Sequence, residues 1–170
     1  TDAAPRRRWP TMYARPMPDA DAGRCPSCGA RWSDEATCQQ RFDEALALEF
    51  SDVRFGAVHH LTVPAFMLQH DRYTHDGWLA TRALLAEFLA EGLRPEEARR
   101  RRPRLEGSFS RGAPFARFAE IRWTRTIADL DLTDAAAYRR NVEAWARSVI
   151  RDSAAVVRHQ PGRRIDRQRL

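Results

Sequence analysis

The sequence predicts an all-α protein, a small irregular helical bundle that carries a zinc knuckle near its amino end. In every segment with a clear hydrophobic period, the apolar residues recur at helical spacing. The sequence contains no internal repeat and no glycine-rich phosphate loop, either of which would indicate another architecture. A Cys-x-x-Cys pair followed by one further cysteine indicates a metal site in the loop that precedes the first helix.

Composition divides the chain into three predicted parts. With 170 residues and 43% hydrophobic content, the chain is long enough to bury one core. We predict a flexible arm rich in arginine and proline over 1–23, a zinc-stapled helical domain over 24–157 and a basic tail over 158–170. The sequence has no apolar run long enough to span a bilayer and no signal-peptide pattern, and its cysteine spacing differs from that of a secreted disulfide scaffold. These features predict a cytoplasmic protein without a membrane partner.

The positive charge comes from arginine alone. All 29 basic residues are arginine, and the 23 acidic residues leave a formal net charge of +6. The absence of lysine is typical of a GC-rich coding genome; the alternative is selection for bidentate contacts with phosphate or carboxylate, which arginine makes and lysine does not. Because the excess is small and spread over scattered runs, a nucleic-acid partner is the less favoured interpretation.

The first two predicted helices follow the cysteine pair. Ser33 or Asp34 is the expected N-cap of a helix over 37–50, whose apolar face carries Phe42, Leu46 and Phe50. Ser51 and Asp52 are expected to cap a second, largely apolar helix that runs through about His70. Pro64 lies inside it and is expected to kink the helix or divide it in two.

The second half of the domain contains two further long helices. The third helix begins at 74–76 and is closed by Gly92. A short helix over 95–102 and a loop over 103–124 follow, with a short strand around 119–123 as an alternative for part of that loop. Thr126 is expected to cap a turn through Leu130. Thr133 or Asp134 then caps the last long helix, which has a single core-facing stripe formed by Tyr138, Val142, Trp145 and Val149.

The three cysteines have the spacing of a metal site. Cys25 and Cys28 form a knuckle closed by Gly29, in which both sulfurs can reach one tetrahedral Zn²⁺. Cys38 falls in the first turn of the first predicted helix, where the helix dipole favours the thiolate. The alternative is a buried cysteine pair with an unrelated third cysteine. A structural zinc site needs a fourth ligand, and the candidates are His59, His60, His70 and His75.

Helix lengths select His70 among these candidates. If the helices over 37–50 and 52–70 form an antiparallel hairpin, the start of the first lies beside the end of the second. The first helix is about 20 Å long, which brings its start level with a point about one turn before His70. His59 falls short of that point by about 9 Å. We therefore predict Cys25, Cys28, Cys38 and His70 as the ligands, with His59 as the alternative fourth ligand.

The same motifs resemble a known family. Cys25-Pro-Ser-Cys28-Gly-Ala, Cys38, His59-His60-Leu-Thr-Val and Leu68-Gln69-His70, followed by a helix rich in tryptophan and leucine that ends in Gly92-Leu93, resemble the bacterial domain-of-unknown-function family 5946. Thr126-Ile-Ala-Asp-Leu and Val142-Glu-Ala-Trp145 also fit its pattern, so the resemblance covers about 24–156. It implies a bacterial protein with a shared helical fold and a shared metal site, and it implies no reaction.

The chain departs from that family pattern in three places. Pro64 stands where an acidic residue is expected, and Asp71 stands where a proline is expected after the Gln-His pair. The segment between Cys28 and Cys38 is short and lacks a histidine associated with relatives. If that histidine is a ligand or a catalytic group elsewhere, its role is absent or relocated in this chain.

Two classes of function are compatible with these residues. Three thiolates and one imidazole leave no open position for water, which favours a structural zinc in a non-catalytic accessory module that binds a protein partner. The alternative is a zinc-dependent enzyme, in which a metal with an open position activates water and His59, His70 and His75 act as acid–base groups. No His-Glu-x-x-His motif supports the second interpretation.

Overall fold

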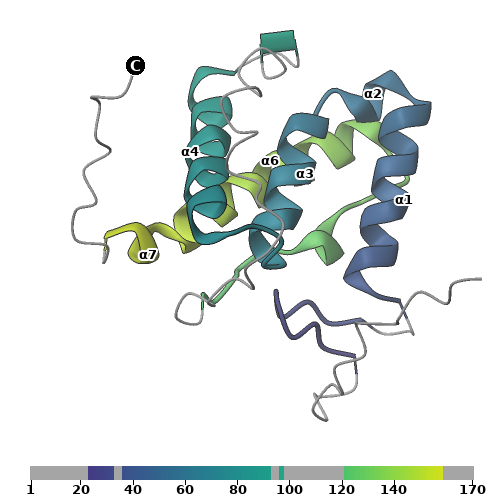
Figure 1. Ribbon diagram of the computed structural model, residues 1–170. Helices are drawn as coiled ribbons and strands as arrows, with labels where there is room; N and C mark the ends of the chain where they lie inside the picture. The colour runs from purple at the N-terminus through teal and green to yellow at the C-terminus, as the bar shows by residue number, and fades with distance from the viewer. Residues whose placement is uncertain (1–22, 33–35, 93–95, 98–120, 159–170) are drawn as a thin grey trace, which may run out of the picture.

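The computed structural model describes residues 23–32, 36–92, 96–97 and 121–158, and their fold is all-α (Figure 1). The only β feature among these residues is an isolated bridge between Arg24 and Arg31. No helix of the described part is both long enough and apolar enough to cross a membrane. The elements are α1 (Cys38–Ser51), α2 (Val53–Gly56), α3 (His59–Gln69), α4 (His75–Glu91), the 3₁₀ turn η3 (Ile127–Asp129), α6 (Ala135–Asp152) and α7 (Ala154–Arg158).

The first helix begins later than its predicted cap. The Thr37 hydroxyl accepts a hydrogen bond from the Gln40 amide at 3.1 Å, and the Gln40 side chain accepts one from the Thr37 amide at 2.8 Å. This reciprocal pair is a capping box, which satisfies two amides that otherwise have no helical partner. The prediction of Ser33 or Asp34 as the N-cap is therefore wrong, and the cap lies directly before Cys38.

The second predicted helix is divided, but not at Pro64. Asp52 caps α2 as predicted, through a hydrogen bond from the Arg54 amide, and the chain then turns at Ala57 and Val58. Pro64 lies inside α3, which begins afresh because the amides of Leu61 and Thr62 both bond to the Val58 carbonyl. Proline removes one helical hydrogen bond there without ending the helix.

Close packing between α1 and α2 requires glycine at position 56. A Cβ atom on Gly56 would lie 2.5 Å from the carbonyl oxygen of Glu49, which is closer than real side chains approach. The glycine therefore lets the backbone of α2 lie directly against that of α1.

The caps of the remaining helices agree with the sequence predictions. Thr74 caps α4 by accepting from the Gly77 amide, and Gly92 ends that helix in the left-handed region with a φ of 59°. Thr126 caps η3, and Asp134 caps α6. These small polar residues accept hydrogen bonds from the first free amides of each helix.

Several predicted segments lie outside the described residues. The arm over 1–23 and the tail over 158–170 fall there apart from their inner ends, as does most of the helix predicted over 95–102, of which 96 and 97 are helical. The same holds for 103–120 of the predicted loop. Residues 121–123 are irregular, so the described part of the 119–123 segment forms no strand.

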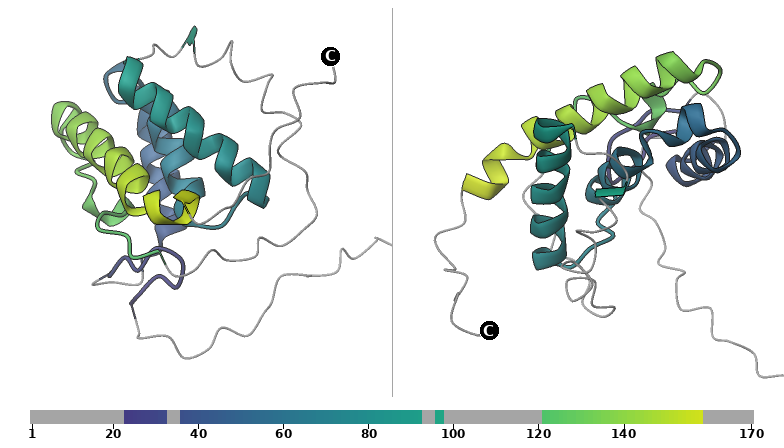
Figure 2. Two further views of the ribbon diagram at one scale, coloured as in Figure 1. Left: turned by 90° about the vertical axis from the view of Figure 1, so that its left-hand side faces the viewer. Right: turned by 90° about the horizontal axis from the view of Figure 1, so that it is seen from above.

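The core forms where α6 crosses α3 and α4, an arrangement visible in Figure 2. The predicted stripe on α6 is confirmed, since none of its four side chains is exposed at all: Tyr138, Val142, Trp145 and Val149. Phe66 of α3, Trp78 of α4 and Leu85 of α4 are also fully buried in this core. Such apolar burial is the main favourable contribution to folding.

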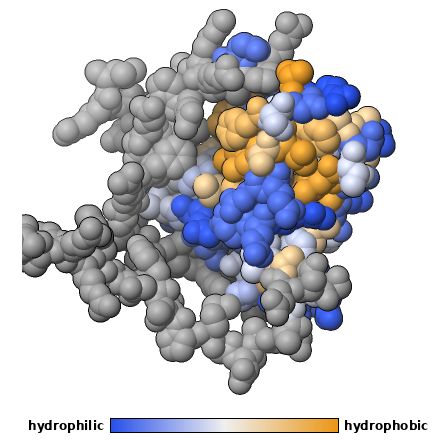
Figure 3. Space-filling view, turned by 90° about the vertical axis from the view of Figure 1, so that its right-hand side faces the viewer, coloured by the Kyte–Doolittle hydropathy of each residue, from blue (hydrophilic) through white to orange (hydrophobic). Residues whose placement is uncertain are grey.

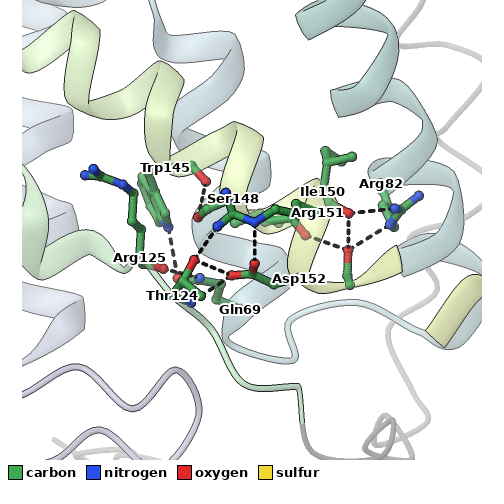
Figure 4. Close-up of polar contacts among 11 residues, drawn as sticks. Gln69, Arg82, Thr124, Arg125, Trp145, Ser148, Ile150, Arg151 and Asp152 are labelled. Carbon is green, nitrogen blue, oxygen red and sulfur yellow. Dashed lines mark hydrogen bonds and ion pairs between the residues drawn. The ribbon is translucent and has the colours of Figure 1, made fainter. Parts of the chain in front are cut away.

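A buried amide connects the end of α3 to α6 (Figure 4). Gln69 is 1% exposed; its side-chain amide donates to the Arg125 carbonyl at 2.8 Å and accepts from Trp145 Nε1 at 3.0 Å. Burying an amide is unfavourable unless it forms hydrogen bonds, and here both ends have a partner. Gln69 therefore fixes the carboxyl end of α3, where His70 follows.

Two further polar contacts hold the end of α6, as Figure 4 also shows. The Asp152 carboxylate, whose side chain is only 4% exposed, accepts from the backbone amide and the hydroxyl of Thr124 at 2.7 and 2.8 Å. Arg82 of α4 donates to the Ser153 hydroxyl and to the Ile150 carbonyl, each at 2.8 Å. Together these contacts hold the irregular segment before η3 and the middle of α4 against the end of α6, at residues 150–153.

Candidate metal centre

The loop over 23–32 folds back on itself as a knuckle. The Cys25 amide donates to the Ala30 carbonyl at 2.8 Å, and the Gly29 amide donates to the Cys25 carbonyl at 2.9 Å. Gly29 has a φ of 76°, a backbone conformation that residues with a Cβ atom rarely adopt. The turn places the sulfurs of Cys25 and Cys28 on one side of the loop.

Four side chains from three parts of the chain converge beside this knuckle. The Cys25 sulfur lies 3.7 Å from His70 Nε2, and the Cys28 sulfur lies 3.6 Å from the Cys38 sulfur. All four ligand atoms lie within 4.8 Å of one another, and the group could hold a metal ion. Cys28 and Cys38 are buried, whereas Cys25 and His70 are partly exposed.

The helices bring these residues together in the predicted way. Cys38 is the first residue of α1, and His70 is the C-cap of α3. The start of α1 therefore lies beside the end of α3. The predicted hairpin survives the break at Ala57 and Val58, since the short α2 reverses the chain before α3 returns along α1.

The His70 ring is oriented by its own helix. Its Nδ1 donates to the Phe66 carbonyl at 2.8 Å, so Nε2 is the ring nitrogen that faces Cys25. The ring also stacks on Phe66 with centroids 4.0 Å apart, and Phe66 stacks on Phe42 at 3.9 Å. Metal-binding histidines commonly donate their second ring nitrogen to a carbonyl in this way, which fixes the tautomer that can bind an ion.

The three neighbouring sulfurs shift one another's pKa values. The adjacent Cys28 and Cys38 side chains hold the pKa of Cys25 far below its usual range. The neighbouring Cys25 side chain raises the pKa of Cys28, and it raises the pKa of Cys38 to about 11. An ion that takes all three sulfurs as thiolates must displace the remaining thiol protons, so its affinity increases with pH.

Most of the chain matches one known protein family. A family model described as "Family of unknown function (DUF5946)" matches residues 23–154. The chain belongs to the DUF5946 family. No curated protein and no solved structure matches it. The resemblance proposed from the motifs is thus confirmed, and the matched segment contains all four residues of the candidate centre.

The other three histidines in the described part of this DUF5946 protein, His59, His60 and His75, lie apart from the sulfurs. His59 starts α3, about 16 Å along the helix from His70, and its Nδ1 lies 2.6 Å from a Glu49 carboxylate oxygen. His75 starts α4, where its Nδ1 lies 3.4 Å from an Asp76 carboxylate oxygen. His60 packs its ring edge-on to Phe88. Neither His59 nor His75 joins the group that could hold a metal ion.

A second buried polar cluster was missed by the sequence analysis. Glu49, whose side chain is completely buried, accepts hydrogen bonds from His59 Nδ1 at 2.6 Å, the Thr62 hydroxyl at 2.5 Å and the Tyr138 hydroxyl at 2.6 Å. Burial, reinforced by the hydrogen bond to Glu49, raises the pKa of Tyr138. The cluster joins α1, α3 and α6 and satisfies the buried carboxylate. Its one sequence signal is the position of Glu49, in register with Phe42 and Ala45 on the apolar face of α1.

Proposed function

We propose that Cys25, Cys28, Cys38 and His70 bind one Zn²⁺ in a closed structural site. The observation that carries this proposal is the convergence of the four ligand atoms within 4.8 Å of one another. Tetrahedral zinc, with sulfur at about 2.3 Å and imidazole nitrogen at about 2.0 Å, separates its ligand atoms by about 3.6–3.8 Å. The Cys28–Cys38 separation of 3.6 Å and the Cys25–His70 separation of 3.7 Å are close to these values.

The bound ion would fasten the knuckle to the helical core. The loop over 23–32 contributes two of the four ligands, while the others come from α1 and from the end of α3. Thiolate and imidazole donors favour zinc over the oxygen-preferring Mg²⁺ and Ca²⁺. Because these thiolates must stay reduced, we assign the protein to a reducing compartment such as the cytoplasm.

A closed site favours a binding role over catalysis. Zinc enzymes that activate water keep one coordination position open, and here an imidazole nitrogen lies close enough to fill it. We propose a non-catalytic accessory module that binds a protein partner. Its binding surface is the corner between α1 and α2, where Phe50 is 77% exposed and Val53 is 84% exposed. Figure 3 shows hydrophobic side chains gathered on this face, as is typical of interaction sites.

The partner surface can be tested by affinity capture. We expect the double variant Phe50→Ser and Val53→Ser to lose a stoichiometric partner that the unmodified protein retains in extract of its native host. Val157, 38% exposed on α7, provides the matched control, since Val157→Ser removes apolar surface elsewhere. Mass spectrometry quantifies the captured partner. Equal retention by the double variant and the control would contradict a partner surface at this corner.

A further inference from the structure

A hollow of about 530 Å³ lies between α3, α4 and α6, at the opposite end of α3 from His70. Its floor is apolar and includes Leu61, Phe88 and Leu89, whereas the wall formed by α6 is charged. A hollow of this size is in the range of small-molecule sites, which combine apolar walls with a few polar groups. None of its lining residues belongs to the candidate metal centre.

The charged wall contains arginines that form no ion pair with carboxylates of the described part of the chain. Arg139, Arg140 and Arg147 are exposed residues of α6 that line the hollow, and none forms an ion pair with any residue in the described ranges. Arg140 and Arg147 lie seven residues apart, so they share one helical face. Glu143 lies on the same wall, and with it the four residues carry a formal charge of +2. An anionic group is therefore attracted to this wall.

A buried imidazole nitrogen without a hydrogen-bond partner belongs to a residue that lines the hollow. His60 lines the hollow, and its Nδ1 is buried without a hydrogen-bond partner. Burial lowers the pKa of His60, chiefly because the surrounding apolar groups disfavour the charged ring. A buried polar atom without a partner is unfavourable, and a polar ligand group would relieve that cost.

We propose that this hollow binds a small amphipathic carboxylate, with its apolar body on the floor and its carboxylate on the α6 arginines. Guanidinium groups bind carboxylates through paired, charge-assisted hydrogen bonds. The volume suits a small molecule. Glu143 reduces the charge of the wall, which favours a singly charged carboxylate over a doubly charged phosphate.

The test is calorimetric titration of the full chain with decanoate below its micelle concentration. We expect the double variant Arg140→Ala and Arg147→Ala to bind decanoate about tenfold more weakly, because two charge-assisted contacts are lost. The matched control removes two exposed arginines elsewhere, Arg54 and Arg122, and should bind as the unmodified protein does. Ala136→Trp, which fills the hollow without changing charge, should also weaken binding.

Two comparisons make the result decisive. Decanol, which lacks the charge, should bind at least tenfold more weakly than decanoate to the unmodified protein; equal binding, or no effect of the arginine variant, would overturn the proposal. Tighter binding of decyl phosphate would overturn the assignment to a carboxylate. His60→Phe removes the unpaired nitrogen, so it should leave the melting temperature unchanged or higher while it weakens decanoate binding.

Discussion

Alanine in place of His70 is expected to remove bound zinc and to lower the free energy of unfolding by about 4 kcal/mol, a loss typical of a destroyed metal site. In the proposed site the substitution leaves the three sulfurs without their fourth ligand. Zinc content after dialysis and urea unfolding monitored by circular dichroism measure the two effects.

His59→Ala is the matched control, since it removes the histidine that was the alternative fourth ligand. We expect full zinc content, because His59 Nδ1 binds Glu49 and lies at the far end of α3. The variant should still lose about 1–3 kcal/mol of stability, since the buried carboxylate of Glu49 is deprived of one donor. Zinc lost from the His59 variant but retained by the His70 variant would reverse the assignment.

Trp145→Ala should cost about 3–5 kcal/mol, the range for truncating a large aromatic side chain in a core. Trp145 is fully buried on α6 and donates to Gln69, which precedes His70. The substitution opens a cavity and leaves the Gln69 oxygen without its donor. Urea denaturation provides the measurement.

Trp145→Phe separates these two contributions. Phenylalanine keeps most of the apolar volume but not the indole N–H, so a loss of about 1–3 kcal/mol is expected from the unpaired amide oxygen alone. A cost below about 1 kcal/mol for Trp145→Ala would contradict the central place of this residue in the core.

Features encoded by local spacing could be predicted from the sequence. Cys25 and Cys28 share one turn, and helix length alone placed His70 rather than His59 near Cys38, where the structure has it. The stripe on α6 has a strict helical period, and small polar residues such as Thr74 mark the helix starts. These signals lie in residues close together in the sequence, so they can be recognised in a single amino-acid sequence without the structure.

Features that depend on distant contacts could not be predicted. Glu49 appears as a surface carboxylate until α3 and α6 bring Thr62 and Tyr138 to it. Pro64 is the strongest local sign of a break, yet the chain turns at Ala57 and Val58, where Gly56 has packed closely against α1. The arginine-lined hollow likewise exists only once three helices are assembled.

X-ray absorption at the zinc edge of the purified protein reports the ligands of the ion. We expect one zinc per chain with three sulfur neighbours at about 2.3 Å and one nitrogen neighbour at about 2.0–2.1 Å. A spectrum without the outer-shell scattering of an imidazole ring, or purified protein without stoichiometric zinc, would contradict a closed site of three cysteines and His70.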